Sequence, residues 1–320
     1  MLTAAIALGL LAVALAWPVP LVLGRASWPS RAPATALVLW QAIALAGGLS
    51  MIGSLLVLGL APFGADLVSA ARELARTLAD PALLATSTVP AGYVVALGAA
   101  ALLAGHLLLN LGMTITRTLR DRRRHRALLL LLSSPHPDRP GAHVIDDPAP
   151  VAYCLPGTAS SLTVVSAGLL ALLDDRELGA VMAHERAHLS QRHDVVLMLF
   201  RAWSASLPWF PIASRAEREV GILVEMLADD LARRSADDRV LATAIALTAG
   251  TAPGDADAGP TTSGASGVMT PSARAAHARV SRLIPASRPL RGPWRALVFA
   301  ASAALLVVPT ALLLAPALAG

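Results

Sequence analysis

Four apolar runs of more than 20 residues constrain this chain more than any other feature of its sequence. A helix needs about 20 apolar residues to cross the hydrocarbon core of a bilayer. The runs are long enough and almost free of charge, and they cover residues 2–23, 34–60, 89–115 and 296–317. Hydrophobic residues make up 55% of the chain and charged residues 15%, with a mean hydropathy of +0.62. We therefore expect a mainly α integral membrane protein with four transmembrane helices.

The first run has a second interpretation, because Ala14-Leu15-Ala16 resembles the cleavage site of a signal peptide. No basic segment precedes this run, however, and its apolar stretch continues past Trp17. These two features favour an uncleaved span.

The arginines predict the orientation of the spans. The formal charge of +5 is compatible with nucleic-acid binding, but the arginines lie beside the apolar runs, which is typical of membrane flanks. The densest group follows the third run and consists of Arg117, Arg120, Arg122, Arg123, Arg124 and Arg126. The positive-inside rule predicts an external N-terminus and a cytoplasmic segment between the third and fourth spans. We expect a multi-pass protein of the cell membrane, with the lipid bilayer as a partner and no direct binding of nucleic acid.

Composition divides the chain into four parts. Residues 1–116 hold three spans, residues 117–248 a cytoplasmic domain and residues 293–320 the fourth span. Residues 249–292 begin with a stretch rich in Gly, Thr, Ser, Ala and Pro, which predicts a flexible linker. The apolar segment 195–211 contains Arg201, Pro208 and two tryptophans, so we interpret it as an interfacial or re-entrant piece.

The cytoplasmic part predicts a small α+β domain. Residues 133–150 read as a loop with a short strand at 143–145. Two β-type runs, 151–155 and 162–165, are separated by Pro156-Gly157 and predict a hairpin. Asp174 or Asp175 then caps a helix with Glu177 in its first turn.

That helix carries His184-Glu185-Arg186-Ala187-His188. Positions i and i+4 lie on one helix face, so His184 and His188 can hold one zinc ion. Glu185 then lies beside the metal, where it can take a proton from a water molecule as general base. The only cysteine is Cys154, which excludes a cysteine-rich zinc site.

A catalytic zinc ion usually has three protein ligands. The best third ligand is Glu225, because Asp229 lies one helical turn further on and can support a ligand histidine as a second-shell carboxylate. Glu217 and Glu219 are rivals, although an amphipathic face with Arg215 and Arg218 explains them without a metal.

Three further side chains are candidates for stabilising the oxyanion of the reaction, and the sequence does not choose among them: Tyr153, His193 and Arg233. His193 follows His188 by five residues, a rotation that takes it off the zinc face of a continuous helix. Within the third run, His106 and Asn110 lie one turn apart and predict a polar contact with a neighbouring helix.

From about residue 149 to 235 the chain resembles the gluzincin membrane metallopeptidases, which include the HtpX and CAAX prenyl protease group and the BlaR/MecR-type regulatory peptidases. The resemblance is carried by residues 164–170, 175–181, 184–188 and 225–229. It implies a zincin-like domain with one Zn²⁺ per chain, His184, His188 and Glu225 as ligands, Glu185 as catalytic base, and residues 151–155 as an edge strand that can pair with substrate.

The four-span layout resembles the BlaR/MecR type more closely. Those proteins carry an extracellular penicillin-binding sensor after the last span, whereas this chain ends at Gly320. The resemblance therefore does not extend β-lactam sensing to this chain.

These features predict a membrane-embedded zinc metalloendopeptidase that hydrolyses a cytoplasmic or membrane-associated protein. A transcriptional repressor with a winged helix is one candidate substrate. The alternatives are a quality-control protease for membrane proteins and a non-enzymatic receptor or scaffold that binds zinc.

Overall fold

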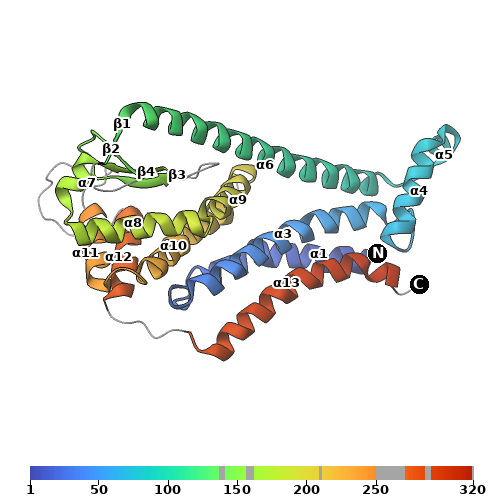
Figure 1. Cartoon of the computed structure of the whole chain (residues 1–320). Helices are drawn as coiled ribbons and strands as arrows, with labels where there is room; N and C mark the ends of the chain where they lie inside the picture. The colour runs from blue at the N-terminus through green and yellow to red at the C-terminus, as the bar shows by residue number, and fades with distance from the viewer. Residues whose placement is uncertain (137–140, 156–161, 209–210, 250–270, 285–289, 319–320) are drawn as a thin grey trace, which may run out of the picture. The chain divides into compact units, whose positions relative to one another are not determined.

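The computed structural model describes residues 1–136, 141–155, 162–208, 211–249, 271–284 and 290–318 (Figure 1). The chain forms two compact units. The apolar unit comprises Met1–Met113, Phe200–Glu219 and Leu290–Gly320, and the sheet unit comprises Thr114–Leu199 and Val220–Pro289. Each unit is described by itself.

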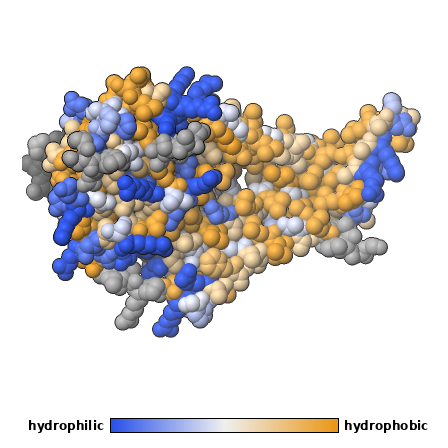
Figure 2. All heavy atoms as spheres, viewed as in Figure 1, coloured by the Kyte–Doolittle hydropathy of each residue, from blue (hydrophilic) through white to orange (hydrophobic). Residues whose placement is uncertain are grey.

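The apolar unit is built almost entirely from helices. Its elements are α1 (Leu2–Ala16), α2 (Pro18–Leu23), η1 (Pro29–Arg31), α3 (Pro33–Leu60), α4 (Leu67–Ala79), α5 (Pro81–Thr86), the first half of α6 (Ala91–Leu132) and α13 (Gly292–Leu318). The end of α9 (His193–Ser206) and the start of α10 (Pro211–Ala232) also belong to this unit. Figure 2 shows apolar side chains over most of the visible surface of α3, α6 and α13.

Four helical segments are long and apolar enough to cross a membrane, by length and composition: Leu2–Leu23, Pro33–Leu60, Ala91–Leu132 and Gly292–Leu314. The first consists of two helices, because Pro18 disfavours helical backbone at Trp17 (φ −127°, ψ −74°). The third does not end where the predicted span ends, at residue 115. It continues to Leu132, since the arginine block contains good helix formers and no glycine or proline.

Small residues bring the helices of the apolar unit together. Ala4, Ala5, Leu8 and Val57 form a buried cluster between α1 and α3. At Gly59 of α3, an added Cβ would lie 2.7 Å from the Leu97 backbone nitrogen of α6. Close backbone approach of this kind requires glycine at the contact.

The predicted contact of His106 with a neighbouring helix is confirmed. Nε2 of His106 in α6 lies 2.9 Å from the carbonyl oxygen of Ser206, the last residue of α9. Asn110 donates to the carbonyl oxygen of His106 at 3.0 Å. This contact attaches the end of α9 to α6 within the apolar unit.

The sheet unit contains four short strands in the order β1-β2-β4-β3. Their bounds are Ser133–Pro135, Ala142–Ile145, Ala152–Leu155 and Leu162–Ser166 for β1 to β4. β2 pairs with β4 in parallel, while β1–β2 and β3–β4 are antiparallel. β3 is therefore an edge strand.

The predicted strands at 143–145, 151–155 and 162–165 are confirmed as β2, β3 and β4, and the last two are antiparallel neighbours, as in a hairpin. The predicted turn at Pro156-Gly157 lies outside the described residues. β1 corrects the prediction of a loop at residues 133–135. A strand ending in Pro135 gives no strand signal in sequence, although proline is tolerated at a sheet edge.

The remaining elements of the sheet unit are α7 (Ala167–Leu172), α8 (Asp175–Ser190), the second half of α10, α11 (Asp238–Ala249) and α12 (Pro271–Leu283). α12 lies inside the segment predicted as a linker, residues 249–292, so this part of that prediction is corrected. Residues 250–270 lie outside the described part.

Two clusters hold α8 in place. Leu178 and Met182 pack with Val165 of β4 and Leu169 of α7. On another face, Ala180 packs with buried residues of α10, α11 and α12, namely Ala232, Leu241, Ala242, Ile245 and Leu283. α8 is thus held between the sheet and a layer of three helices.

Candidate metal centre

The two histidines of the motif are positioned by the start of α8. Asp174 accepts a hydrogen bond from the Glu177 backbone N–H at 2.8 Å, and Glu177 accepts one from the Asp174 N–H at 3.0 Å. This capping box fixes the first turn of the helix. Three turns later, His184 and His188 lie on one face, with their Nε2 atoms 3.1 Å apart. The predicted cap is therefore Asp174 and not Asp175.

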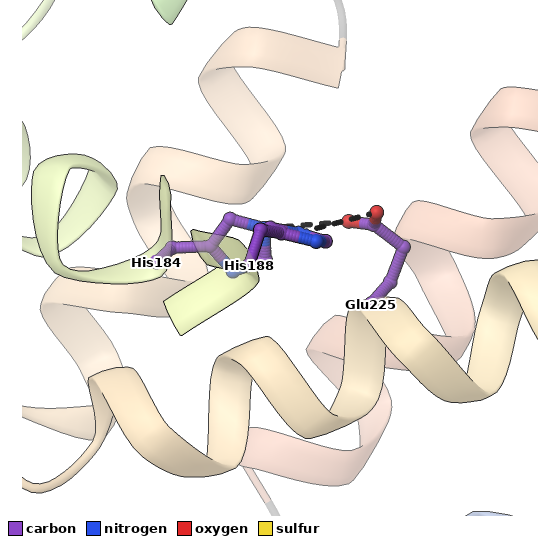
Figure 3. Close-up of side chains that lie close together, drawn as sticks. All are labelled: His184, His188 and Glu225. Atoms are coloured by element: carbon purple, nitrogen blue, oxygen red, sulfur yellow. Dashed lines mark hydrogen bonds and ion pairs between the residues drawn. The ribbon is translucent and has the colours of Figure 1, made fainter. Parts of the chain in front are cut away.

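Helix α10 brings Glu225 to these histidines (Figure 3). One carboxylate oxygen of Glu225 lies 3.3 Å from Nε2 of His184, and the other lies 3.5 Å from Nε2 of His188. Among the described residues, these three side chains form a group whose ligand atoms all lie within 4.8 Å of one another.

The donor set fits a zinc ion. In a tetrahedral site, bonds of about 2.0–2.1 Å separate two ligand atoms by roughly 3.3 Å. The three separations observed here are 3.1, 3.3 and 3.5 Å. Two imidazoles and one carboxylate are also the ligand set of many catalytic zinc sites, which keep one position for water or substrate.

Asp229 supports the site from behind. Its carboxylate is 1% exposed and lies 2.9 Å from Nδ1 of His184, the nitrogen opposite the one that faces Glu225. This contact orients the imidazole so that Nε2 faces the ligand group. The structure thus places Glu225 and Asp229 as the i, i+4 pair that the sequence suggested.

A largely buried arginine, Arg279 of α12, whose side chain is 15% exposed, binds both carboxylates. It donates two hydrogen bonds to Asp229, from Nε at 2.8 Å and from Nη2 at 2.7 Å. Its Nη1 lies 3.1 Å from a carboxylate oxygen of Glu225. A bidentate guanidinium contact of this kind compensates the charge of a buried carboxylate.

The charges around the histidines differ. Burial opposes protonation of His184, but Asp229 and Glu225 outweigh it and raise the pKa of His184 to about 9. Burial lowers the pKa of His188 to about 4. Burial by itself raises the pKa of Glu225, but His184 and Arg279 outweigh this effect and lower the pKa to about 2. Glu225 is therefore an anionic ligand candidate and His188 a neutral one.

Glu185 directly follows His184 in α8. Burial has the largest effect on the pKa of Glu185 and raises it, and repulsion from Glu225 raises it further. His184 and Arg279 lower it, and the resulting pKa is about 7. The backbone N–H of Cys154 in β3 also acts on this carboxylate and lowers its pKa. A carboxylate with a pKa near 7 is suited to both accepting and releasing a proton at neutral pH.

His193 does not continue α8, contrary to the sequence interpretation. The backbone enters the left-handed region at Arg192 (φ 50°), where α8 has ended, and His193 begins α9. The turn brings Nδ1 of His193 to 3.1 Å from Nδ1 of His188. His193 is 2% exposed and contacts the side of His188 that faces away from Glu225. It is placed to fix the orientation of His188.

The other sequence candidates lie elsewhere. Glu217 is 3.8 Å from Arg201, and Glu219 lies beside Gly24 in the apolar unit. Arg233 makes a bidentate contact with Asp238, at 2.7 and 2.6 Å. Tyr153 packs against the ring of His125 at 5.5 Å between centroids. Within the described chain, none of these four side chains forms a hydrogen bond or ion pair with the ligand group.

Sequence reasoning missed Arg279. The residue lies 50 positions after Asp229, beyond the stretch rich in Gly, Ser and Thr. A signal was present in the spacing of Ala276, Val280 and Leu283, which mark one apolar face of a helix. Arginines on such a face, downstream of paired carboxylates, could have indicated the contact.

Comparison with known proteins agrees with this geometry. Residues 118–247 match the model of Peptidase family M48. The match covers less than half of the chain and includes His184, His188, Glu225 and Asp229, but not Arg279. It points to a metallopeptidase of the kind that includes the HtpX and CAAX proteases. No curated protein and no solved structure matches the chain.

Proposed function

We propose that this protein is a membrane-embedded zinc metalloendopeptidase that hydrolyses peptide bonds of a cytoplasmic or membrane-associated protein. One observation carries the proposal: His184, His188 and Glu225 converge in a segment that matches a metallopeptidase family, with Glu185 beside them. The match comes from sequence similarity, and the donor set comes from the geometry of the side chains.

In the proposed mechanism, His184, His188 and Glu225 would hold the zinc ion. When bound, zinc supplies a Lewis acid that makes water more acidic and polarises a carbonyl group. Glu185 accepts the proton of the attacking water and later gives it to the leaving amine. Asp229 and His193 keep the two imidazoles oriented through their Nδ1 atoms. Arg279 keeps Glu225 and Asp229 ionised.

The edge strand β3 is the proposed binding element for substrate. The Ser166 N–H donates a hydrogen bond to the Val151 carbonyl oxygen, and Tyr153 pairs with Val164. The backbone groups of Val151 and Tyr153 therefore face β4. The backbone groups of Ala152 and Cys154 face the open edge instead. An extended peptide can add to such an edge through main-chain hydrogen bonds. Since β3 contacts α8, the bound peptide would lie beside Glu185.

The proposed membrane location rests on the four apolar helices and on the exposed apolar side chains of the apolar unit, such as Leu10 (68% exposed) and Leu102 (76%). The arginines that flank the spans support a cytoplasmic position of the catalytic segment. This position favours a cytoplasmic substrate, and we keep a transcriptional repressor as the first candidate and misfolded membrane proteins as the second.

The test compares protein N-termini in cells that carry the wild type or Glu185→Ala. The proposal expects a small set of new N-termini that depend on wild-type protein. Their position would separate the two roles: one site in one cytoplasmic regulator supports a signalling peptidase, and sites in many membrane proteins support quality control. Identical profiles, with both proteins present in the membrane at equal level, would contradict peptidase activity and favour a zinc-binding scaffold.

A further inference from the structure

A cavity of about 230 Å³ lies inside the apolar unit, and none of its lining residues belongs to the ligand group. It is lined by residues of α1, α2, α3, α9 and α10, and the largest are Leu15, Trp40, Ile43, Met51, Phe200 and Trp203. An apolar cavity of about 150 Å³ is known to stay dry and to bind benzene. The cavity here is larger and almost wholly apolar, so it favours a hydrocarbon group over water.

The cavity has a defined wall. Nε2 of His106 holds the Ser206 carbonyl oxygen at 2.9 Å, which attaches the end of α9 to the unit. Gly47 of α3 lines the cavity and has no side chain to fill the space. An added Cβ there would lie 3.7 Å from Leu15 Cβ and 3.8 Å from Trp203 Cη2, which is ordinary contact distance.

Positive charge surrounds the elements that line the cavity. Residues 17–32 contain Arg25 and Arg31, and residues 200–219 contain three arginines and two glutamates, which gives 5 − 2 = +3. Arg215 lies close to the end of α2, with Cδ 3.6 Å from the Cβ position of Gly24, and Oε1 of Glu219 lies 3.7 Å from the same position, so Glu219 offsets part of this charge. Arg201 is ion-paired only at 3.8 Å, and its side chain is 66% exposed. These arginines suit the phosphate of an anionic lipid.

We propose that this cavity binds one acyl chain of an anionic membrane lipid, whose headgroup is held by Arg201 and Arg215. The inference rests on the proposed membrane location but not on peptidase activity. The outer side chains of the unit are apolar, so lipid hydrocarbon is the medium from which the cavity is filled. Dispersion contacts with Trp40 and Trp203 and the attraction between the arginines and the phosphate supply the binding free energy.

The test uses the full chain purified in mild detergent and measures lipid retention by native mass spectrometry. The probes are phosphatidylglycerol and phosphatidylcholine with the same acyl chains. We expect the wild type to retain phosphatidylglycerol in preference. Gly47→Leu fills the cavity and should weaken retention about ten-fold, which corresponds to about 1.4 kcal/mol of lost packing contacts.

Gly48→Leu is the matched control. It makes the same change one position further on, where an added Cβ meets nothing within 4 Å and where no part of the cavity wall lies. It should retain lipid like the wild type. Replacing Arg201 and Arg215 together by Gln should leave acyl-chain binding intact but abolish the preference for phosphatidylglycerol.

Two results would overturn the proposal: folded Gly47→Leu that retains phosphatidylglycerol like Gly48→Leu, or equal retention of both lipids by the wild type. Folding is checked by circular dichroism and size-exclusion chromatography. Glu185→Ala should retain lipid normally, so a failure of the peptidase proposal is seen separately. Extraction of the cellular protein by carbonate, which releases proteins that are not embedded, tests the membrane location on its own.

Discussion

The apolar unit and the sheet unit differ in the charge of the polar groups that they bury. Among the described residues, three buried polar atoms have no hydrogen-bond partner: the hydroxyls of Thr35 and Ser50 in the apolar unit and Nε2 of His193 in the sheet unit. The buried carboxylate of Asp229 in the sheet unit, by contrast, contacts both His184 and Arg279. A neutral hydroxyl can be buried alone at modest cost, whereas a buried charge cannot.

This difference indicates which kind of substitution should destabilise each unit. The apolar unit depends on volume at close helix contacts, such as Gly59 against Leu97. The sheet unit depends on the charge balance among a few side chains around His184. Helix α10 contributes to both units, with small residues such as Ala213 and Ala216 near its start and Glu225 and Asp229 in its second half.

The largest expected effect is on catalysis in the sheet unit. Glu185→Ala should lower the rate of peptide hydrolysis by about 10²–10⁴, because it removes the general base. Zinc content, measured by elemental analysis, should not change, since none of the three ligand side chains is altered. Arg186→Gln, an exposed neighbour on α8, is the control. Cleavage by Glu185→Ala at the wild-type rate would remove Glu185 from the mechanism.

The charge balance of the sheet unit is tested next. Arg279→Met leaves Asp229 buried without its cation and should lower the free energy of unfolding by about 3–5 kcal/mol. The control is Arg233→Met, because the pair of Arg233 with Asp238 is partly exposed and is worth at most about 1 kcal/mol. Both are measured by denaturant unfolding of the full chain in micelles. Equal losses would show that burial does not distinguish the two pairs.

A smaller effect is expected at the other imidazole. His193→Ala removes the contact with Nδ1 of His188 and should weaken zinc affinity by about 10–100-fold. His193→Gln can still accept a hydrogen bond and should recover part of the affinity. Competition with a chromophoric chelator gives the dissociation constants. Unchanged affinity in His193→Ala would leave the residue a packing role only.

The smallest effect belongs to the apolar unit. Gly59→Ala places a Cβ against the Leu97 backbone nitrogen and should cost about 1–2 kcal/mol through overpacking. Gly48→Ala has open space and should be neutral or slightly stabilising, since alanine favours a helix over glycine. Thermal unfolding of the full chain compares the two. Equal stability of the two variants would mean that α3 and α6 move apart without cost.

The parts of the fold that follow from local rules were predictable from sequence. Apolar run length indicated the four long helices, a capping box indicated the start of α8, and an i, i+4 spacing brought His184 and His188 together. What the sequence did not show depends on distant contacts. Arg279 reaches Asp229 across 50 residues, and His193 meets His188 only because the backbone turns at Arg192. The helical spacing around Arg279 indicates a helix but not the partner of the arginine, and the turn at Arg192 has no periodic signature.

The open edge of β3 has a further consequence for timing. The Cys154 N–H belongs to this edge and also lowers the pKa of the Glu185 carboxyl group. Under the proposed function, a peptide that adds to the edge would need the same N–H for its carbonyl oxygen. Docking of substrate would then remove this donor from Glu185 and raise the proton affinity of its carboxylate, so the base would become stronger when a peptide is in place.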